Sequence, residues 1–120
     1  MIIGIGTDII EINRFIGIAN KKNQMERIFT KNEQLLFNGR NYSTLAANFA
    51  AKEAFAKAVG TGFRSFMPID IEVMRNELGK PYINLYNNAK SIADSLNVGK
   101  IHISLSHSKE NAIAYLILEE

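Results

Sequence analysis

The chain has 120 residues, 47% hydrophobic and 22% charged, which is an ordinary composition for one folded domain. No apolar run approaches the roughly 18 residues of a membrane span, and the absence of cysteine excludes disulfides and thiolate metal sites. The net charge of +2 and the pI of 8.9 weakly favour an acidic partner. We therefore expect a soluble, cytoplasmic protein in which any metal is held by oxygen or histidine.

Residues 2 to 10 predict a buried strand, because apolar residues alternate with Gly4 and Gly6. Glycines at these positions let another backbone pack closely. Asp8 lies in the same isoleucine-rich run, where a carboxylate needs a hydrogen-bond donor, a cation or a metal. For this residue alone, capping of a helix that begins near residues 9–13 is a slightly better explanation than metal binding.

Residues 9 to 29 predict a basic amphipathic helical segment, interrupted near Asn20 and Asn23. Four cations against two acids make it either an ordinary solvated face or a docking surface for an acidic partner. The cations are Arg14, Lys21, Lys22 and Arg27. Residues 30–33, Thr-Lys-Asn-Glu, form a capping box that predicts a short helix through Phe37.

The longest predicted helix is rich in alanine, begins near Ser43 and ends within Gly60-Thr61-Gly62. Phe49, Glu53 and Lys57 follow one another at intervals of one turn on one face. From that spacing alone, a surface ion pair between Glu53 and Lys57, worth about 0.3–0.5 kcal/mol, is the simplest interpretation.

The second half of the chain changes to strand periodicity. Residues 69–74 predict a half-buried strand, in which Ile69, Ile71 and Val73 alternate with Asp70, Glu72 and Met74 on the outward face. This strand is expected to pair, through a turn, with residues 81–86. A helix over 87–96 is expected to be capped by its first asparagine. Residues 101–105 and 112–118 predict a second hairpin. This order predicts an α+β fold with a mainly antiparallel sheet and a long central helix.

Three separate pieces of the chain resemble the group I 4′-phosphopantetheinyl transferases. They are Gly4-Ile5-Gly6-Thr7-Asp8-Ile9, the segment Phe49-Ala50-Ala51-Lys52-Glu53-Ala54-Phe55-Ala56-Lys57, and Ser104-Leu105-Ser106-His107-Ser108. Asp70-Ile71-Glu72-Val73 and Gly79-Lys80-Pro81 are also similar to pieces of that family. The resemblance therefore spans the chain and implies a single 4′-phosphopantetheinyl transferase domain over residues 1–120.

The resemblance implies a Mg²⁺-dependent transfer of the 4′-phosphopantetheine arm of coenzyme A to a serine of apo acyl carrier protein, which releases adenosine 3′,5′-bisphosphate. Asp8 and Glu53 match the family's metal-binding carboxylates, and Mg²⁺ commonly takes only one or two carboxylates. Lys57 matches the active-site lysine, where its ammonium can reach the diphosphate. Glu53, or a water that it holds on the metal, is the candidate acceptor of the serine proton.

The remaining implied roles concern the two substrates. His107 matches a family histidine that contacts a phosphate of coenzyme A, although a buried structural histidine would explain the residue equally well. Ser106 is a further candidate for donating to phosphate oxygens. The family recognises acidic carrier proteins through basic residues of the first helix, which Arg14 matches best and which Lys21 and Lys22 extend.

The family also implies a homotrimer with coenzyme A between subunits, a role in fatty-acid biosynthesis, and no nucleic-acid or membrane partner. One departure is Asn48, which stands where the family often has an arginine. If that arginine pairs with a phosphate, this chain lacks one charge-assisted contact with coenzyme A, while both carboxylates and Lys57 remain.

Two alternative functions fit parts of the sequence. A Mg²⁺-dependent phosphodiesterase or nuclease would also use Asp8, Glu53 and a nearby lysine against phosphate. However, no basic stripe interleaved with aromatics accompanies them. A non-enzymatic basic module that binds an acidic protein accounts for residues 14–27 but leaves Asp8, Glu53 and Lys57 unexplained.

Overall fold

The computed structural model describes residues 1 to 120 and contains two antiparallel sheets and five α-helices. The strands are β1 (Ile2–Glu11), β2 (Ile71–Arg75), β3 (Pro81–Leu85), β4 (Lys100–His107) and β5 (Asn111–Glu119). The helices are α1 (Arg14–Ala19), α2 (Lys22–Ile28), α3 (Lys31–Leu36), α4 (Tyr42–Val59) and α5 (Asn87–Ser95). Every strand pairing is antiparallel, which confirms the predicted α+β class.

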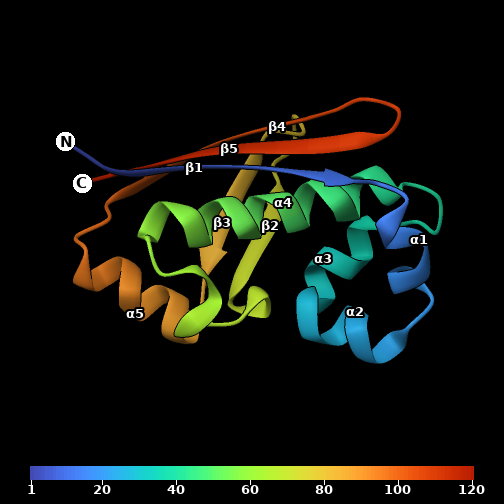
Figure 1. The fold of residues 1–120 in the computed structure, drawn as a ribbon, viewed down its shortest axis with the longest axis horizontal. Helices are drawn as coiled ribbons and strands as arrows, with labels where there is room; N and C mark the ends of the chain where they lie inside the picture. Colours follow the sequence, from blue (N-terminus) through green and yellow to red (C-terminus); the bar gives the residue numbers. More distant parts are fainter.

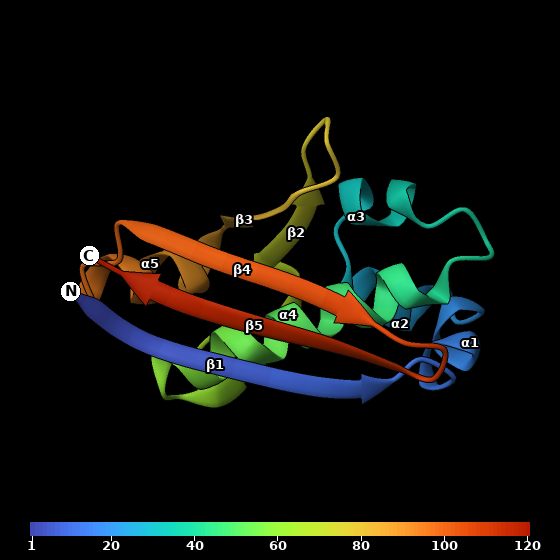
Figure 2. The ribbon, with the colours of Figure 1, turned by 90° about the horizontal axis from the view of Figure 1, so that it is seen from above.

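The larger sheet has the order β1-β5-β4, and α4 runs along one of its faces (Figure 1). The hairpin of β2 and β3 lies on the β4 side of this sheet, next to α3, as the view from above shows (Figure 2). Helices α1 and α2 lie near the end of β1, while both chain termini lie together at the opposite end of the sheet. None of the helices is both long and apolar enough to span a bilayer.

Gly4 and Gly6 let β1 lie directly on the backbone of α4. A Cβ at Gly4 would overlap the carbonyl oxygen of Ala58, and a Cβ at Gly6 would overlap that of Ala54. The predicted close packing of two backbones is therefore confirmed. It holds the strand and the helix in one register, and this register determines which residues of β1 lie near which turn of α4.

Helix α4 is central because small alanines let neighbours approach it from several sides. Eleven of its 18 residues are buried. The partly exposed stripe that remains carries Phe49, Glu53 and Lys57. The helix ends at Gly60, whose φ of 88° is the left-handed cap conformation that favours glycine.

Two predictions near the N-terminus are wrong. Asp8 does not cap a helix, because β1 continues to Glu11 and Asp8 pairs with Ala114 of β5 within the sheet. Backbone pairing with β5 thus overrides the helical spacing of the isoleucines that follow, and α1 begins only at Arg14. The interruption near Asn20 is confirmed, whereas Asn23 lies inside α2.

Three details of the later elements also differ. Residues 68–70 form a 3₁₀ turn, so β2 begins at Ile71 instead of residue 69. Glu72 is buried although the alternation predicted an outward position, because α3 covers that side of the hairpin. Asn87 is the first residue of α5, and Tyr86 is its N-cap. The capping box at the start of α3 is confirmed.

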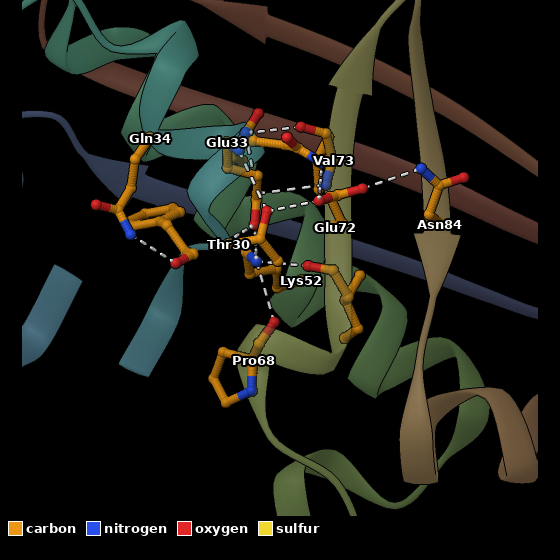
Figure 3. A network of polar contacts seen from close by, with 12 residues as sticks. Thr30, Glu33, Gln34, Lys52, Pro68, Glu72, Val73 and Asn84 are labelled. Carbon is orange, nitrogen blue, oxygen red and sulfur yellow. Dashed lines mark hydrogen bonds and ion pairs between the residues drawn. The ribbon is translucent and has the colours of Figure 1, made fainter. Parts of the chain in front are cut away.

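A buried polar network ties α4 to α3 and β2 (Figure 3). Lys52 and Glu33 are fully buried, and the Lys52 Nζ lies 2.7 Å from the Glu33 Oε1. The same ammonium donates to the carbonyl oxygens of Pro68, at 3.0 Å, and of Ile71. The other carboxylate oxygen of Glu33 accepts from Asn48 Nδ2 at 3.1 Å. Every buried side-chain polar atom has a hydrogen-bond partner.

Electrostatics make this pair depend on both of its members. Burial raises the pKa of Glu33 and lowers the pKa of Lys52, while their mutual attraction and hydrogen bonds oppose both shifts. A partner left alone in this site would be a buried charge without compensation.

We therefore predict that Lys52→Met lowers the free energy of unfolding by about 3–5 kcal/mol, because it strands Glu33. Urea denaturation measures this value. Lys57→Met is the matched control from the same helix, since the Lys57 side chain is 56% exposed, and it should cost less than about 1 kcal/mol. Equal losses in the two variants would contradict the structural role of the buried pair.

Candidate functional site

Asp8 lies on the helix-facing side of β1, where the register set by Gly6 brings it beside α4. Its Oδ1 lies 3.1 Å from the Lys57 Nζ, and the Asp8 side chain is only 17% exposed. The Lys57 ammonium also donates to the carbonyl oxygen of Thr7 at 3.0 Å. The ion pair of Lys57 is therefore made across the fold with Asp8. The ion pair between Glu53 and Lys57 that the helical spacing suggested is absent.

Glu53 lies on the same stripe of α4 and makes no side-chain hydrogen bond or ion pair within the chain. Burial raises the pKa of Glu53, and the nearby negative charge of Asp8 raises it further. The positive charges of Lys57 and Arg14 lower the pKa of Glu53 and so oppose this shift. The two carboxylates thus lie close enough to repel each other, and a lysine pairs with one of them.

This arrangement offers two carboxylate side chains. No group of three or more histidine, aspartate or glutamate side chains is placed to hold a metal. Asp8 and Glu53 therefore suit a cation that takes one or two protein carboxylates and completes its coordination with other oxygens, as Mg²⁺ does. Lys57 adds a positive charge beside them for an anionic group.

A second polar site lies at the other edge of the sheet. His107, at the end of β4, lines a pocket of about 230 Å³ with the first turns of α4 and the β2–β3 hairpin. Its polar lining comes from Ser43, Thr44, Arg75 and His107. His107 is exposed, so the interpretation as a buried structural histidine is wrong.

Ser106 does not join this pocket. Successive residues of a strand point to opposite faces, and Ser106 lies opposite Ile113 on the face of the sheet that α4 does not cover. Within one chain, the candidate residues therefore fall into three groups. Asp8, Glu53 and Lys57 lie at the β1 edge, His107 lies at the β4 edge, and Ser106 lies on the open face.

The basic residues of α1 and of the start of α2 lie in two different places. The Arg14 guanidinium lies 5.7 Å from the centre of the Phe49 ring, one turn from Glu53 along α4. Lys21 is exposed just before α2, and Lys22 is 87% exposed with only a 4.0 Å contact to Glu26. Arg14 therefore lies beside the carboxylate cluster, whereas the two lysines extend a solvent-facing surface away from it.

Sequence reasoning missed Arg75, which lines the His107 pocket from the end of β2. No local signal indicates it, because a single arginine at the end of an alternating strand is typical of a solvated position. Its one informative neighbour is Asn48, which is distant in sequence.

The family model described as the 4′-phosphopantetheinyl transferase superfamily matches residues 4–116. A curated relative from Alkaliphilus oremlandii, named holo-[acyl-carrier-protein] synthase, is 56% identical over 98% of this chain and 98% of its own length.

Solved structures agree. The holo-[acyl-carrier-protein] synthase of Neisseria meningitidis matches with a TM-score of 0.89 and 34% identity over 100% of both chains. The Bacillus anthracis enzyme, solved in complex with CoA (3′,5′-ADP), matches with a TM-score of 0.80 and 40% identity over 98% of this chain and 96% of its own.

Proposed function

The chain belongs to the 4′-phosphopantetheinyl transferase superfamily, and we propose that Asp8, Glu53 and Lys57 form the catalytic centre of a holo-[acyl-carrier-protein] synthase. The enzyme transfers the 4′-phosphopantetheine arm of coenzyme A to a serine of apo acyl carrier protein and releases adenosine 3′,5′-bisphosphate. One observation carries this assignment: two carboxylates and a lysine from β1 and α4 lie side by side. The fold on which they lie is similar to that of the Neisseria meningitidis synthase over the whole chain.

The residues present fit a Mg²⁺ ion. Glu53 has no donor of its own, and the charge of Asp8 raises its pKa, so a divalent cation between the two would relieve their repulsion. Asp8 and Glu53 would hold the ion, which would neutralise charge that develops on the diphosphate oxygens during transfer. Lys57 supplies a further positive charge beside Asp8 for the same diphosphate.

The chemical step is the attack of the serine oxygen on the phosphorus that carries the pantetheine arm. A new serine oxygen–phosphorus bond forms, and the bond to the leaving phosphate of adenosine 3′,5′-bisphosphate breaks. Glu53, or a water that it holds, accepts the serine proton, because it is the carboxylate of the cluster that no side chain of this protein pairs with. Lys57 orients the diphosphate and offsets its charge.

We also propose the homotrimer. The sheet face away from α4 exposes apolar side chains on two neighbouring strands, which are 42–64% exposed in one chain. They are Ile5, Ile9, Ile113 and Tyr115. The carboxylate cluster and the His107 pocket lie at opposite edges of the same sheet, so a ring of copies can place one edge of each beside the other edge of its neighbour. Coenzyme A would then bind between two chains.

The carrier protein is proposed to dock on α1 and the start of α2. Arg14 lies next to the catalytic cluster, and Lys21 and Lys22 extend positive charge outward from it. An acidic partner placed on this surface would have its serine directed toward Glu53. Ser106, on the open face, could contact coenzyme A only at a subunit boundary. The cytoplasmic location and the role in fatty-acid biosynthesis stay predictions.

The alternatives explain less. A nuclease would need a groove that follows a polyanion, whereas the cations here are divided between a docking surface and two small sites. A binding module without activity leaves the Asp8–Lys57 pair and the unpartnered Glu53 without a role.

The first prediction for this function is that Glu53→Gln and Asp8→Asn each abolish transfer while leaving the fold intact. Each variant removes a charged metal ligand with little change in volume. The mass gain of an apo carrier measures transfer, and calorimetry should show weakened Mg²⁺ binding. Glu77→Gln, an exposed glutamate of the β2–β3 turn, is the matched control. Near wild-type turnover of either site variant at saturating Mg²⁺ would refute the assignment.

The second prediction concerns assembly. Tyr115→Glu places a charge in the open apolar face and should convert the trimer into monomers that lose activity, because each site needs two chains. Sedimentation velocity measures the state. Tyr82→Glu changes a tyrosine of β3 that is 43% exposed, against 47% for Tyr115, and should leave the assembly unchanged. A wild-type chain that sediments as a fully active monomer would contradict the proposal.

The third prediction concerns carrier docking. Arg14→Glu and Lys22→Glu should each raise the KM for apo carrier, chiefly through slower association. The difference from wild type should shrink with salt, because the Debye length falls from about 10 Å at 0.1 M to about 3 Å at 1 M. Only Arg14→Glu should also raise the KM for coenzyme A, since Arg14 lies beside the carboxylate cluster.

Lys90→Glu, on α5 at the other end of the molecule, serves as the charge-reversal control (Figure 1). If Arg14→Glu and Lys22→Glu gave carrier KM values equal to that of this control at every salt concentration, the basic face would be only a solvated surface.

A further inference from the structure

Arg75 is a half-buried cation without a carboxylate of its own. Its Nη2 donates to the Asn48 Oδ1 at 2.8 Å, and its Nη1 donates to the Met74 carbonyl oxygen at 3.3 Å. The structure contains five ion pairs, and none of them includes Arg75. Burial lowers the pKa of Arg75, and the charge of Glu33 opposes this shift although Glu33 is itself paired with Lys52. The guanidinium is thus positioned while its charge is left without a partner.

Asn48 holds this guanidinium in place. The Asn48 side chain is buried, and its amide nitrogen donates to the Glu33 Oε2 at 3.1 Å and to the Val73 carbonyl oxygen at 3.0 Å. With both donor bonds used in this way, the amide orientation is determined, and its oxygen is turned toward Arg75. The buried network therefore extends to the rim of the pocket and restricts where Arg75 can lie.

The pocket that Arg75 lines is suited to a small anion. It also contains His107 and the hydroxyl-bearing residues Ser43 and Thr44, and no carboxylate is among its lining residues. Ser43 and Thr44 belong to the first turn of α4, the positive end of an 18-residue helix. The site therefore has hydrogen-bond donors on several sides: a guanidinium, a histidine, two hydroxyls and a helix N-terminus.

We infer that Arg75, held by Asn48, binds the 3′-phosphate of coenzyme A in this pocket, beside His107. The inference rests on the proposed function, because it assigns the second phosphate group of the same co-substrate. The diphosphate is assigned to the cluster of Asp8, Glu53 and Lys57, which leaves the 3′-phosphate for the remaining cationic site. Position 48 carries asparagine in this chain, and β2 supplies a guanidinium to the same neighbourhood through Arg75.

This reassignment changes the consequence drawn from Asn48. The asparagine does not remove a charge-assisted phosphate contact from the chain, because its role is to position the arginine that makes the contact. Arg75 is therefore a binding residue, and Asn48 is a positioning residue that acts through it.

The test compares coenzyme A with 3′-dephospho-coenzyme A in the wild type, Arg75→Gln and Arg75→Lys. The wild type should bind coenzyme A about 10- to 100-fold more tightly than the dephospho form, as expected for a charge-assisted contact. Arg75→Gln keeps a donor for Asn48 but removes the charge, so it should lose most of this discrimination. Its KM for coenzyme A should rise about 10- to 100-fold, with kcat and the dephospho KM nearly unchanged. The discrimination of Arg75→Lys should lie between those of the wild type and Arg75→Gln, because lysine keeps the charge but lacks the planar guanidinium that donates two parallel hydrogen bonds.

Lys31→Ala removes one exposed positive charge outside the pocket and is the control for a general effect of charge. Calorimetry gives the binding ratio of the two nucleotides independently of turnover. A wild type that binds both forms equally, or an Arg75→Gln variant that keeps the wild-type ratio, would overturn the inference. Absence of transfer with normal discrimination would instead refute the proposed function alone. If Arg75→Gln fails to fold, Arg75→Lys supplies the comparison, and a wild-type ratio in that variant would contradict the role of the planar guanidinium.

Discussion

The buried pair of Lys52 and Glu33 is the interaction on which the rest of the structure depends. It joins α4 to α3, and the same ammonium bonds the turn before β2, so three segments share one fully enclosed cation. Such a pair does not have to add net stability, because desolvation opposes the attraction. What it provides is a defined orientation, since any other rotation of α4 would leave a buried charge unpaired. Asn48 and Arg75 continue the same network to the surface.

A second constraint determines how closely β1 packs on α4 and which residues of the two elements lie side by side. Gly4 and Gly6 remove the side chains that would keep the two backbones apart, and the carbonyl oxygens of Ala54 and Ala58 occupy that space. Asp8, two residues after Gly6 on the same face of the strand, then reaches Lys57. The carboxylate cluster is thus a consequence of backbone packing at positions where no side chain could be accommodated.

The two polar sites serve different parts of one proposed co-substrate but lie at opposite edges of a three-stranded sheet. The exposed apolar face between those edges offers a reason for the separation, because the proposed assembly through that face would bring unlike edges together. In this proposal one complete coenzyme A site consists of the β1 edge of one chain and the β4 edge of its neighbour. The same three strands would then carry both the assembly face and the substrate-binding edges.

The sequence by itself determined the fold class, the long alanine helix with its glycine stop, the capping box before α3 and the two hairpins, because all of these depend on local propensity and periodicity. Motifs that resemble a known family also indicated Asp8, Glu53 and Lys57, the residues that we propose to be catalytic. The sequence failed where distant segments compete with local preference. From its neighbours alone, Asp8 fits a helix cap slightly better than a metal site, because pairing with β5 has no local signature. The alternation likewise points Glu72 outward, because nothing local shows that α3 covers it.

Only the tertiary structure decided which side chains interact with one another. Lys57 pairs with Asp8 across the fold and not with Glu53 one turn away, Ser106 and His107 face opposite sides of a strand, and Asn48 directs Arg75 into a pocket. Each of these depends on which long-range contact satisfies a buried or partly buried charge. Local sequence states that a charge exists, but only the packing of segments far apart in the chain determines which group compensates it.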